Sequence, residues 1–227
     1  MPAALRAVVA TLEKLYPGTR PPPVRTPFEA ILHENAGYLV DDARRDRVFA
    51  ALKKSVGTTP QKILAAPRAA LLAALEHGGM KPEHRAEKLV RAARIAFDLG
   101  EDLAAVVRRP LPDALRVLRA FPGMGRAGAE RLVLLAGAHP VLALESNGLR
   151  VLVRLGFAAE QKSYEATYRA VRAAVDPEVP AAPARVLRAH LLLRRHGQEL
   201  CRRSGPRCAV CPLAPGCGWA LARVKAV

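Results

Sequence analysis

The sequence predicts an all-α fold, and three of its features lead to that prediction. Apolar residues recur at three- and four-residue spacing through most of the chain, which is the period of a helix with one buried face. No segment shows the apolar–polar alternation of a half-buried strand. Clusters of Pro and Gly interrupt the helical pattern where helices would connect. With 227 residues, 51% of them hydrophobic, the chain can bury a core in one large domain or in two lobes.

About ten helices are expected in order along the chain, followed by an irregular C-terminal loop. Each expected helix shows the helical apolar period, and the ranges are 3–15, 28–40, 44–55, 68–76, 85–98, 112–120, 126–136, 146–156, 163–174 and 184–196. Breaker clusters separate several of them: Pro17-Gly18, Pro21 to Pro23, Gly57 to Pro60, Gly78-Gly79, Pro110 to Pro112, Pro122 to Gly125 and Pro177 to Pro183.

The chain is strongly basic. Lys and Arg outnumber Asp and Glu by 36 to 20, which gives a formal net charge of +16 and a pI near 10.7. A polyanion is the expected partner, and we expect nucleic acid rather than a membrane because no isolated basic amphipathic anchor is present. No apolar run approaches the roughly 18 to 20 residues that cross a bilayer. A soluble, intracellular, monomeric protein is expected. The alternative is that the Arg- and Ala-rich composition, and the positive charge with it, reflects the base composition of the genome and not a nucleic-acid partner.

The four cysteines of the chain form a compact C-x6-C-x2-C-x5-C pattern near the C-terminus. They are Cys201, Cys208, Cys211 and Cys217, in a run rich in Pro and Gly. Thiolates that converge in this way bind iron-sulfur clusters or zinc. Zinc sites usually show two short C-x2-4-C pairs, and only one is present, so the pattern favours a [4Fe-4S] cluster. Zinc and a pair of disulfides are the alternatives.

A tight Pro-Gly-x-Gly turn is the second motif. It lies in the segment 121–129, between two expected helices, and contains Gly123, Met124, Gly125 and Arg126. The two glycines permit positive φ and close backbone approach. Amides at the start of the following helix are then free to donate to a phosphate. An ordinary connection between helices is the alternative, but the basic chain and the cysteine motif favour a DNA-binding hairpin.

This hairpin, followed by the cysteine motif, resembles the iron-sulfur helix-hairpin-helix DNA glycosylases of the endonuclease III superfamily. Pro27-Phe28-Glu29 and His196-Gly197 also resemble segments of that family. The resemblance implies two lobes, with double-stranded DNA in the cleft between them. A helical barrel lobe would span 27–139, and a cluster lobe would combine 1–26 with 140–227. Members of the family flip a damaged or mismatched base out of the duplex and hydrolyse its N-glycosidic bond, a reaction expected in the cytoplasm at the nucleoid.

The resemblance also implies further DNA contacts. The family inserts a side chain into the DNA stack from a turn that matches 79–81 here, so Met80 is the candidate, with plain packing as the alternative. Arg202, Arg203 and Arg207 crowd the loop between Cys201 and Cys208. They are expected to contact phosphates, although part of their charge would compensate the cluster.

Two catalytic positions depart from the family pattern. Ala127 replaces the lysine that forms a Schiff base in the bifunctional members, and Arg126 cannot act as an amine nucleophile. This implies a monofunctional glycosylase. Glu145 replaces the catalytic aspartate at the start of a helix. Because glutamate caps helices poorly, we expect Ser146 to cap this helix and to leave Glu145 free for catalysis. A solvated glutamate is the alternative.

The expected helix 28–40 carries a polar set that the resemblance places beside the base pocket. Glu34, Tyr38 and Asp42 recur every four residues and would share one face. Tyr38 is a stacking candidate, and Glu34 is a second catalytic candidate. Glu34 or Asn35 would read the hydrogen-bonding edge of the base, and Asp42 would hold water or a structural bond. Asn35 lies on the apolar stripe and should have a buried partner. A solvated acidic face paired with Arg44-Arg45 is the alternative.

Two other functions compete with hydrolysis. The fold can act as a DNA-binding module without turnover, which Ala127 and Glu145 favour. It can also act as a lyase that uses another amine, either Lys81 or Lys88 or the N-terminal amine exposed by removal of Met1.

Overall fold

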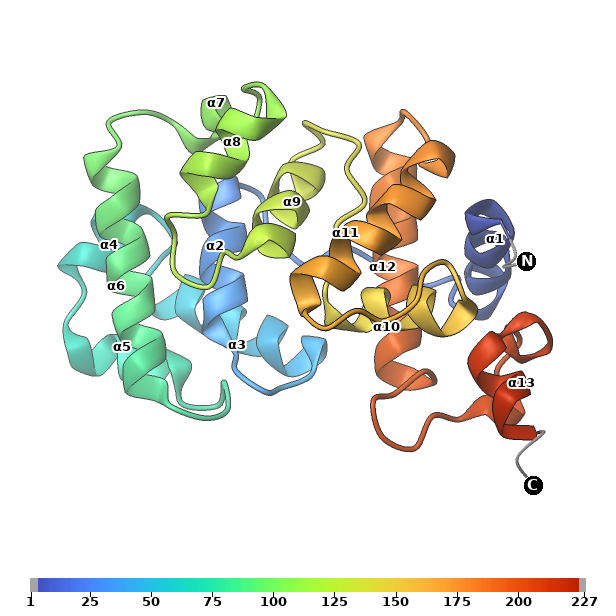
Figure 1. Cartoon of the computed structure of the whole chain (residues 1–227). Coiled ribbons are helices and arrows are strands. Elements are labelled where there is room, and N and C mark those ends of the chain that lie inside the picture. Colours follow the sequence, from blue (N-terminus) through green and yellow to red (C-terminus); the bar gives the residue numbers. More distant parts are fainter. Residues whose placement is uncertain (1–3, 225–227) are drawn as a thin grey trace. The chain divides into compact units, whose positions relative to one another are not determined.

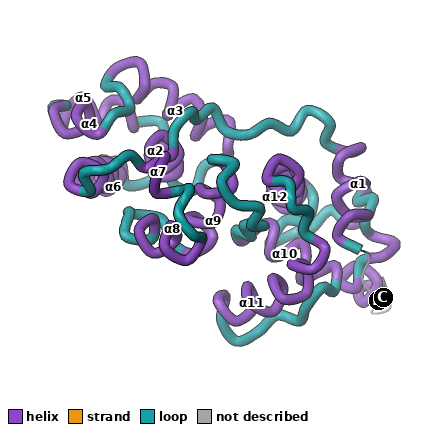
Figure 2. The backbone as a smooth tube through the Cα atoms, turned by 90° about the horizontal axis from the view of Figure 1, so that it is seen from above, coloured by secondary structure: helices purple, strands orange, loops and turns teal. Residues whose placement is uncertain are grey.

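The structure, a computed structural model, describes residues 4–224. Thirteen α-helices and three short 3-10 helices account for the regular structure of this range, and no strand forms within it (Figure 2). The all-α prediction is therefore confirmed. A single isolated β-bridge joins Tyr38 to Gly79. In the described range, no helix has the length and apolar character needed to span a bilayer.

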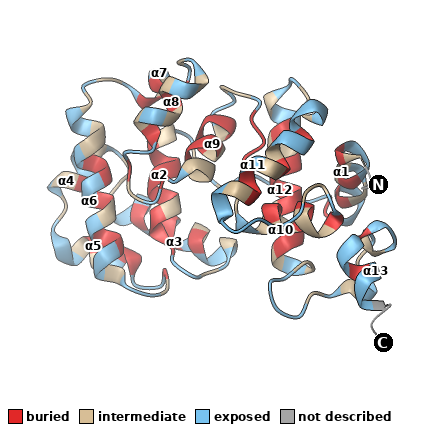
Figure 3. Ribbon diagram, in the orientation of Figure 1, coloured by how far each residue is buried: buried red, intermediate tan, exposed pale blue. Residues whose placement is uncertain are grey.

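The chain divides into two compact units. One unit runs from Pro22 to His139, and the other combines the chain up to Pro21 with the chain from Pro140 onward. Each unit has a core of its own, coloured red in Figure 3.

The unit 22–139 is built around one buried helix, α2. Eight of the ten residues of α2 are buried, and the helix packs against α3, α6, α7 and α9. Leu52, Leu75 and Leu118 of this unit are fully buried, as are Ile31 and Leu32 of α2. The helices of this unit (Figure 1) are α2 (Pro27–Ala36), α3 (Asp42–Ser55), α4 (Pro60–Ala65), α5 (Arg68–Leu75), α6 (Pro82–Asp98), α7 (Leu103–Val106), α8 (Leu111–Leu118) and α9 (Arg126–Leu135).

Local caps explain where several of these helices begin. The side chains of Thr26, Asp41 and Thr59 each accept a hydrogen bond from the amide three residues ahead, at the starts of α2, α3 and α4. Asp102 caps α7 in the same manner, from the amide of Ala104. The helices α4 and α7 were not predicted, because six and four residues are too few to show a helical period.

The expected helix 28–40 is wrong beyond Ala36. Gly37 leaves α2 in an extended conformation, and Asp41 caps a new helix through the amide of Arg44. Tyr38 lies in the connection, where its amide donates to the carbonyl of Gly78 at 2.8 Å. Glu34, Tyr38 and Asp42 therefore do not share one helical face.

The other unit is built around α12, which packs against α1 and α10. Gly197 lies where α12 meets α10, because a Cβ there would come within 2.7 Å of the Asn147 backbone. Tyr168, Leu152 and Leu192 are completely buried in this unit. Its elements are α1 (Leu5–Leu15), α10 (Ser146–Leu155), α11 (Tyr164–Val175), η1 (Asp176–Glu178), α12 (Pro183–Glu199), η2 (Cys208–Val210), η3 (Ala214–Gly216) and α13 (Gly218–Val224).

Candidate functional site

The Pro-Gly-x-Gly turn joins α8 to α9 in the conformation that its glycines allow. Gly123 has a φ of +76°, and a Cβ at this residue would lie 2.8 Å from Oδ1 of Asn35. Gly125 is exposed and begins α9, and no side chain caps this helix. Since the first amides of a helix lack partners within it, the start of α9 presents donors to a ligand such as a phosphate.

Two residues of the turn are less available than the sequence suggested. Only 5% of Met124 is exposed, and its amide donates to the carbonyl of Phe121 at 3.1 Å. Neither the side chain nor the amide of Met124 is exposed as a donor in this structure, and its predicted DNA contact stays a prediction. Arg126 lies in the first turn of α9, where Nε donates to the buried carboxylate of Glu130 at 3.2 Å.

A buried arginine that the sequence did not reveal organises the loops next to α2. The guanidinium of Arg85 donates to the carbonyl oxygens of Ala36 at 2.7 Å, Gly79 at 3.0 Å and Met80 at 3.0 Å. Burial lowers the pKa of Arg85 from its ordinary value. A Cβ at Gly78 would lie 2.0 Å from Nη1 of Arg85, so Gly78 makes room for the guanidinium, while a Cβ at Gly79 would lie 2.2 Å from the carbonyl oxygen of Tyr38.

The loops held by Arg85 present two apolar side chains to solvent. Met80 is 57% exposed and Leu39 is 75% exposed, so Met80 does not serve as packing. Leu39 also has a φ of +58°, a strained value for a leucine. Strained backbone of this kind often marks functional positions. The sequence did not identify Leu39 as a candidate site residue, because no sequence pattern predicts a leucine in the left-handed conformation.

The polar residues of α2 have partners from other helices. Nη1 of Arg131 contacts Oε2 of Glu34 at 2.5 Å, and Nη1 of Arg45 lies 3.8 Å from the same oxygen. Asn35 is buried and donates from Nδ2 to the carbonyls of Ile31 and Pro122, both at 2.9 Å. The buried partner predicted for Asn35 is thus confirmed.

The two other pocket candidates lie apart from α2. Tyr38 is exposed in the connection between α2 and α3. Asp42 lies in the first turn of α3, where Oδ1 is 3.6 Å from Nη1 of Arg45. The stacking role of Tyr38 and the ligand role of Asp42 stay predictions.

Glu145, in the other unit, caps α10 itself. Its Oε1 accepts from the amide of Gly148 at 2.8 Å, and its Oε2 accepts from the amide and the side chain of Asn147 at 3.0 and 2.7 Å. Nη1 of Arg194 lies 3.3 Å from Oε2. The expectation that Ser146 caps this helix is wrong, since Ser146 is the first helical residue and is exposed.

The candidate amines are distributed as follows. Ala127 lies in the first turn of α9, so no amine is present at this position. Lys81 and Lys88 line one pocket with Glu34. The N-terminal amine lies outside the described residues.

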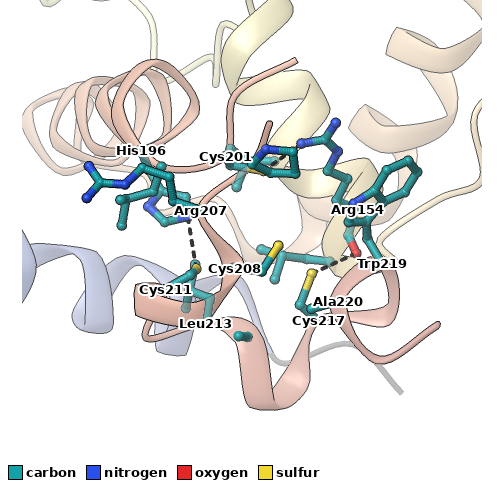
Figure 4. A pocket seen from close by; sticks show the side chains of 15 residues that line it. Arg154, His196, Cys201, Arg207, Cys208, Cys211, Leu213, Cys217, Trp219 and Ala220 are labelled. Carbon is teal, nitrogen blue, oxygen red and sulfur yellow. Dashed lines mark hydrogen bonds between the residues drawn. The ribbon is translucent and has the colours of Figure 1, made fainter. Parts of the chain in front are cut away.

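The four cysteines line a single pocket at the C-terminal end of the chain. Figure 4 shows Cys208, Cys211 and Cys217 around one space, with His196 on one side and Trp219 on the other. Nη1 of Arg154 lies 3.5 Å from Sγ of Cys201.

Four thiols in one pocket are the donors that iron-sulfur clusters and zinc require. Burial raises the pKa of Cys201 and Cys211, and the neighbouring thiolates raise them further. A bound cationic centre would relieve that repulsion and hold the thiolates ionised. Nε2 of His196 lies 3.5 Å from Sγ of Cys211, and burial lowers the pKa of His196 to about 4. Within residues 4–224, no three His, Cys, Asp or Glu side chains converge as ligands of one ion.

The loop that carries these cysteines is basic. Arg202, Arg203 and Arg207 are all exposed. The guanidinium of Arg154 donates to the carbonyls of Arg202 at 2.7 Å and Arg203 at 3.2 Å. The backbone of the loop is thereby fixed. Nε of Arg202 donates to the carbonyl of Glu199 at 3.1 Å, and Arg207 lines the cysteine pocket.

No protein-family model matches the chain, and a search of curated proteins found no significant match. Solved structures do match it. Endonuclease III trapped in a covalent complex with DNA has a TM-score of 0.75 and 22% identity, over 97% of both chains. A thermostable thymine-DNA glycosylase has a TM-score of 0.73 and 18% identity, over 96% of this chain and 97% of that one.

A 3-methyladenine DNA glycosylase from H. pylori is similar at a TM-score of 0.64 and 16% identity, over 86% of this chain and 95% of that one. The similarity spans both units, including the hairpin and the segment that precedes the cysteines. Over nearly its whole length, therefore, the chain has the fold of endonuclease III and the other helix-hairpin-helix DNA glycosylases.

Proposed function

We propose that the protein is a DNA glycosylase of base-excision repair that hydrolyses the N-glycosidic bond of a damaged or mismatched base in duplex DNA. The observation that carries the proposal is the match to endonuclease III in complex with DNA over 97% of both chains. The net charge of +16 suits a polyanionic partner. The protein would act as a monomer on DNA in the cytoplasm, at the nucleoid.

The hairpin and the exposed loops supply the DNA contacts in this proposal. Amides at the start of α9, from Gly125 onward, would bind a phosphate together with Arg126. Met80 and Leu39 would enter the stack when a base is extruded, because both are apolar and exposed. Arg202, Arg203 and Arg207 would bind further phosphates.

Glu145 would supply the catalytic negative charge. Positive charge develops on the sugar as the glycosidic bond breaks, and a fixed carboxylate nearby stabilises it. Both oxygens of Glu145 already accept hydrogen bonds from the start of α10. Three hydrogen bonds hold the carboxylate in place, which suits electrostatic stabilisation, and the second lone pair of Oε1 would still be able to accept a proton from water. Glu34, paired with Arg131, is the second carboxylate candidate.

Ala127 makes the proposed enzyme monofunctional. Without an amine at this position, no Schiff base forms there, so the product is a released base and an intact abasic site. Lys81 and Lys88 are the amines that would contradict this assignment, because both line a pocket with Glu34.

The four cysteines would hold a [4Fe-4S] cluster with a structural role. Bound thiolates would fix the loop that presents Arg202, Arg203 and Arg207. Iron and acid-labile sulfide in equal amounts are expected in protein purified without oxygen, and each Cys→Ser variant should lose both. A measurement of one zinc atom per chain and no acid-labile sulfide would show that the cysteines bind zinc and not a [4Fe-4S] cluster.

A panel of duplexes that each carry one modified or mispaired base tests the function. Strand cleavage seen only after alkali is the expected result and would identify the substrate. Cleavage without alkali, with trapping by borohydride, would show a lyase. Tight binding without cleavage under either condition would show a DNA-binding protein without turnover.

A further inference from the structure

A pocket beside the exposed loops contains a buried arginine with unused donors. The pocket lies within the unit 22–139 and is lined by residues from α2, the connection after it, α3, α6 and the hairpin turn. The residues that matter here are Glu34, Asn35, Leu39, Arg45 and Gly123.

Arg45 is the group that points to a ligand. Only 9% of the residue is exposed, yet Nε and Nη1 have no hydrogen-bond partner among the described residues. The carboxylates of Glu34 and Asp42 balance its charge from 3.8 and 3.6 Å, beyond hydrogen-bond distance. Buried donors without acceptors are unfavourable, so hydrogen bonds from Arg45 would stabilise a ligand that brings an acceptor into this pocket.

The pocket also presents an acceptor, and its orientation is fixed. Both amide hydrogens of Asn35 are donated, one to Ile31 and one to Pro122. Oδ1 must therefore face the other way, toward Gly123, where a Cβ would come within 2.8 Å of it. An arginine donor and an amide acceptor in one pocket match the edge of a nucleobase. A phosphate offers only acceptors, so it would pair with Arg45 and with Lys81 and Lys88 of the same pocket, but it would leave Oδ1 of Asn35 without a donor and would be repelled by Glu34.

We propose that this pocket is a nucleobase subsite in which Arg45 donates to a carbonyl oxygen of the base, so that Arg45 is a specificity-determining residue. The proposal rests on the proposed function, because a base reaches the pocket only after it leaves the DNA stack. Arg45 can donate but cannot accept. The subsite therefore favours bases with a carbonyl oxygen, such as guanine and thymine, over analogues that lack that oxygen.

The surroundings of Arg45 support a rigid donor. Its aliphatic stem packs against Gly37, where a Cβ would lie 3.3 Å from both Cβ and Cγ of Arg45. Arg131 holds the Glu34 carboxylate at 2.5 Å, and Nε and Nη1 of Arg45 have no hydrogen-bond acceptor among the described residues. Leu39, 75% exposed, lines the same pocket. Leu39, which would displace a base from the stack, is therefore adjacent to the subsite that would receive the base.

The test combines protein variants with base analogues in a double-mutant cycle. Duplexes carry a single guanine or thymine opposite a tetrahydrofuran abasic analogue, because an unpaired base leaves the stack easily. Matched duplexes carry 2-aminopurine, which lacks O6 of guanine, or 5-methylpyrimidin-2-one, which lacks O4 of thymine. The Kd of each duplex is measured at one salt concentration for wild type, Arg45→Met, Arg45→Lys and Arg47→Met.

Wild type should lose roughly 10- to 100-fold in affinity when the oxygen is removed from at least one of the two bases. Arg45→Met should bind both members of that pair alike. Arg47 lies on the same helix with its side chain exposed. Arg47→Met should therefore keep the wild-type difference in Kd between the paired duplexes, and it shows the effect of losing one positive charge. Arg45→Lys retains the charge and should lose most of the difference, which keeps the test valid if the methionine variant is unfolded.

Two outcomes contradict different claims. If wild type binds the duplexes but no oxygen removal changes its affinity, or if Arg45→Met keeps the difference, Arg45 binds only water or serves packing, and the subsite is wrong. If wild type binds none of the duplexes at low salt, the proposed glycosylase function itself is wrong.

Discussion

Nδ2 of Asn35 donates a hydrogen bond of 2.9 Å to the carbonyl oxygen of Pro122, 87 residues further along the chain. The same amide group donates to Ile31 within α2. The hairpin turn is therefore attached to the most buried helix of its unit, and the amides at the start of α9 are presented from a rigid support. Gly123 packs against the same side chain, because a Cβ at this residue would lie 2.8 Å from Oδ1 of Asn35.

Gly123→Ala should destabilise the protein more than Gly137→Ala. Both glycines have positive φ, +76° and +67°, and alanine in that region is unfavourable by about 1 to 2 kcal/mol. A Cβ at Gly137 meets nothing within 4 Å, whereas at Gly123 it meets Asn35. Because Asn35 cannot retreat without breaking two hydrogen bonds, we expect a further loss of roughly 1 to 3 kcal/mol. Urea unfolding of both variants measures the difference.

Removal of the Asn35 side chain is the control for that comparison. In an Asn35→Ala background, the excess loss caused by Gly123→Ala should vanish, while the loss caused by Gly137→Ala should be unchanged. An excess that persists without Asn35 would show that backbone strain, not the contact with Oδ1, sets the cost.

Asn35 also shows what the sequence could predict and what it could not. A polar residue on an apolar stripe must have a buried partner, and that expectation is confirmed. The identity of one partner, the carbonyl of Pro122, depends on packing between α2 and a turn far along the chain. The hairpin, the cysteine pattern and the all-α class were readable because each has a local signature.

The misjudged features arise from competition between local preferences and contacts. The apolar period continues past Ala36, yet the helix ends there because Asp41 caps a new helix and Tyr38 pairs with the turn at Gly78. Glutamate is a weak helix cap on average, yet Glu145 caps α10 with both oxygens. In such cases the hydrogen-bond partners that surround a residue decide where a helix begins or ends, and the average helix or capping preference of the residue does not.

Arg85→Met should destabilise the loops next to α2. The variant leaves three carbonyl oxygens without their donor, and each buried acceptor that loses its partner is unfavourable by about 1 to 3 kcal/mol. Only the hydrogen bond to Ala36 is fully buried, and water can reach the other two carbonyls, so we expect a loss of roughly 1 to 3 kcal/mol and faster proteolysis within residues 77–81. Arg91→Met is the matched control, because Arg91 is an exposed arginine of the same helix, and it should change neither quantity.

Stability should fall at mildly acidic pH because of His33. Burial lowers the pKa of His33, and the hydrogen bond that its Nε2 donates to Oδ1 of Asp46 at 2.7 Å only partly opposes this effect. Between the lowered pKa and the ordinary value near 6.5, the unfolded chain binds more protons than the folded chain. The free energy of unfolding therefore rises with pH in this window, and it falls as pH drops below about 6.5, by up to about 1.4 kcal/mol per pH unit.

His33→Gln isolates this contribution. Between about pH 7.5 and pH 5.5, wild type should lose more unfolding free energy than the variant, which cannot titrate at this position. His84→Gln, which removes an exposed histidine, should behave as wild type does. Equal losses in wild type and His33→Gln would mean that another group causes the acid sensitivity.

Leu39→Gly should separate stability from function. The left-handed backbone of Leu39 is unfavourable for leucine, so glycine should stabilise the protein by about 1 kcal/mol. The same change removes the 75% exposed side chain, and base extrusion should weaken. Fluorescence of 2-aminopurine placed beside an abasic analogue reports the unstacking. Phe97→Ala removes another exposed apolar side chain, on α6, and should leave the signal unchanged.

Glu145→Gln should abolish base release while DNA affinity stays within a fewfold of wild type. Glutamine still accepts one hydrogen bond at the start of α10, so the stability loss should stay near 1 kcal/mol, but the negative charge that opposes the developing positive charge is lost. Removal of one such electrostatic contact lowers turnover by about a hundredfold or more. Glu145→Asp keeps the charge and the cap but shortens the side chain by one methylene, so it should retain the cap and lose rate according to the displacement of the carboxylate. Single-turnover kinetics with the identified substrate compare the three proteins. Unchanged turnover in Glu145→Gln would restrict this residue to capping α10 and would transfer the catalytic role to Glu34, which Glu34→Gln would then test directly.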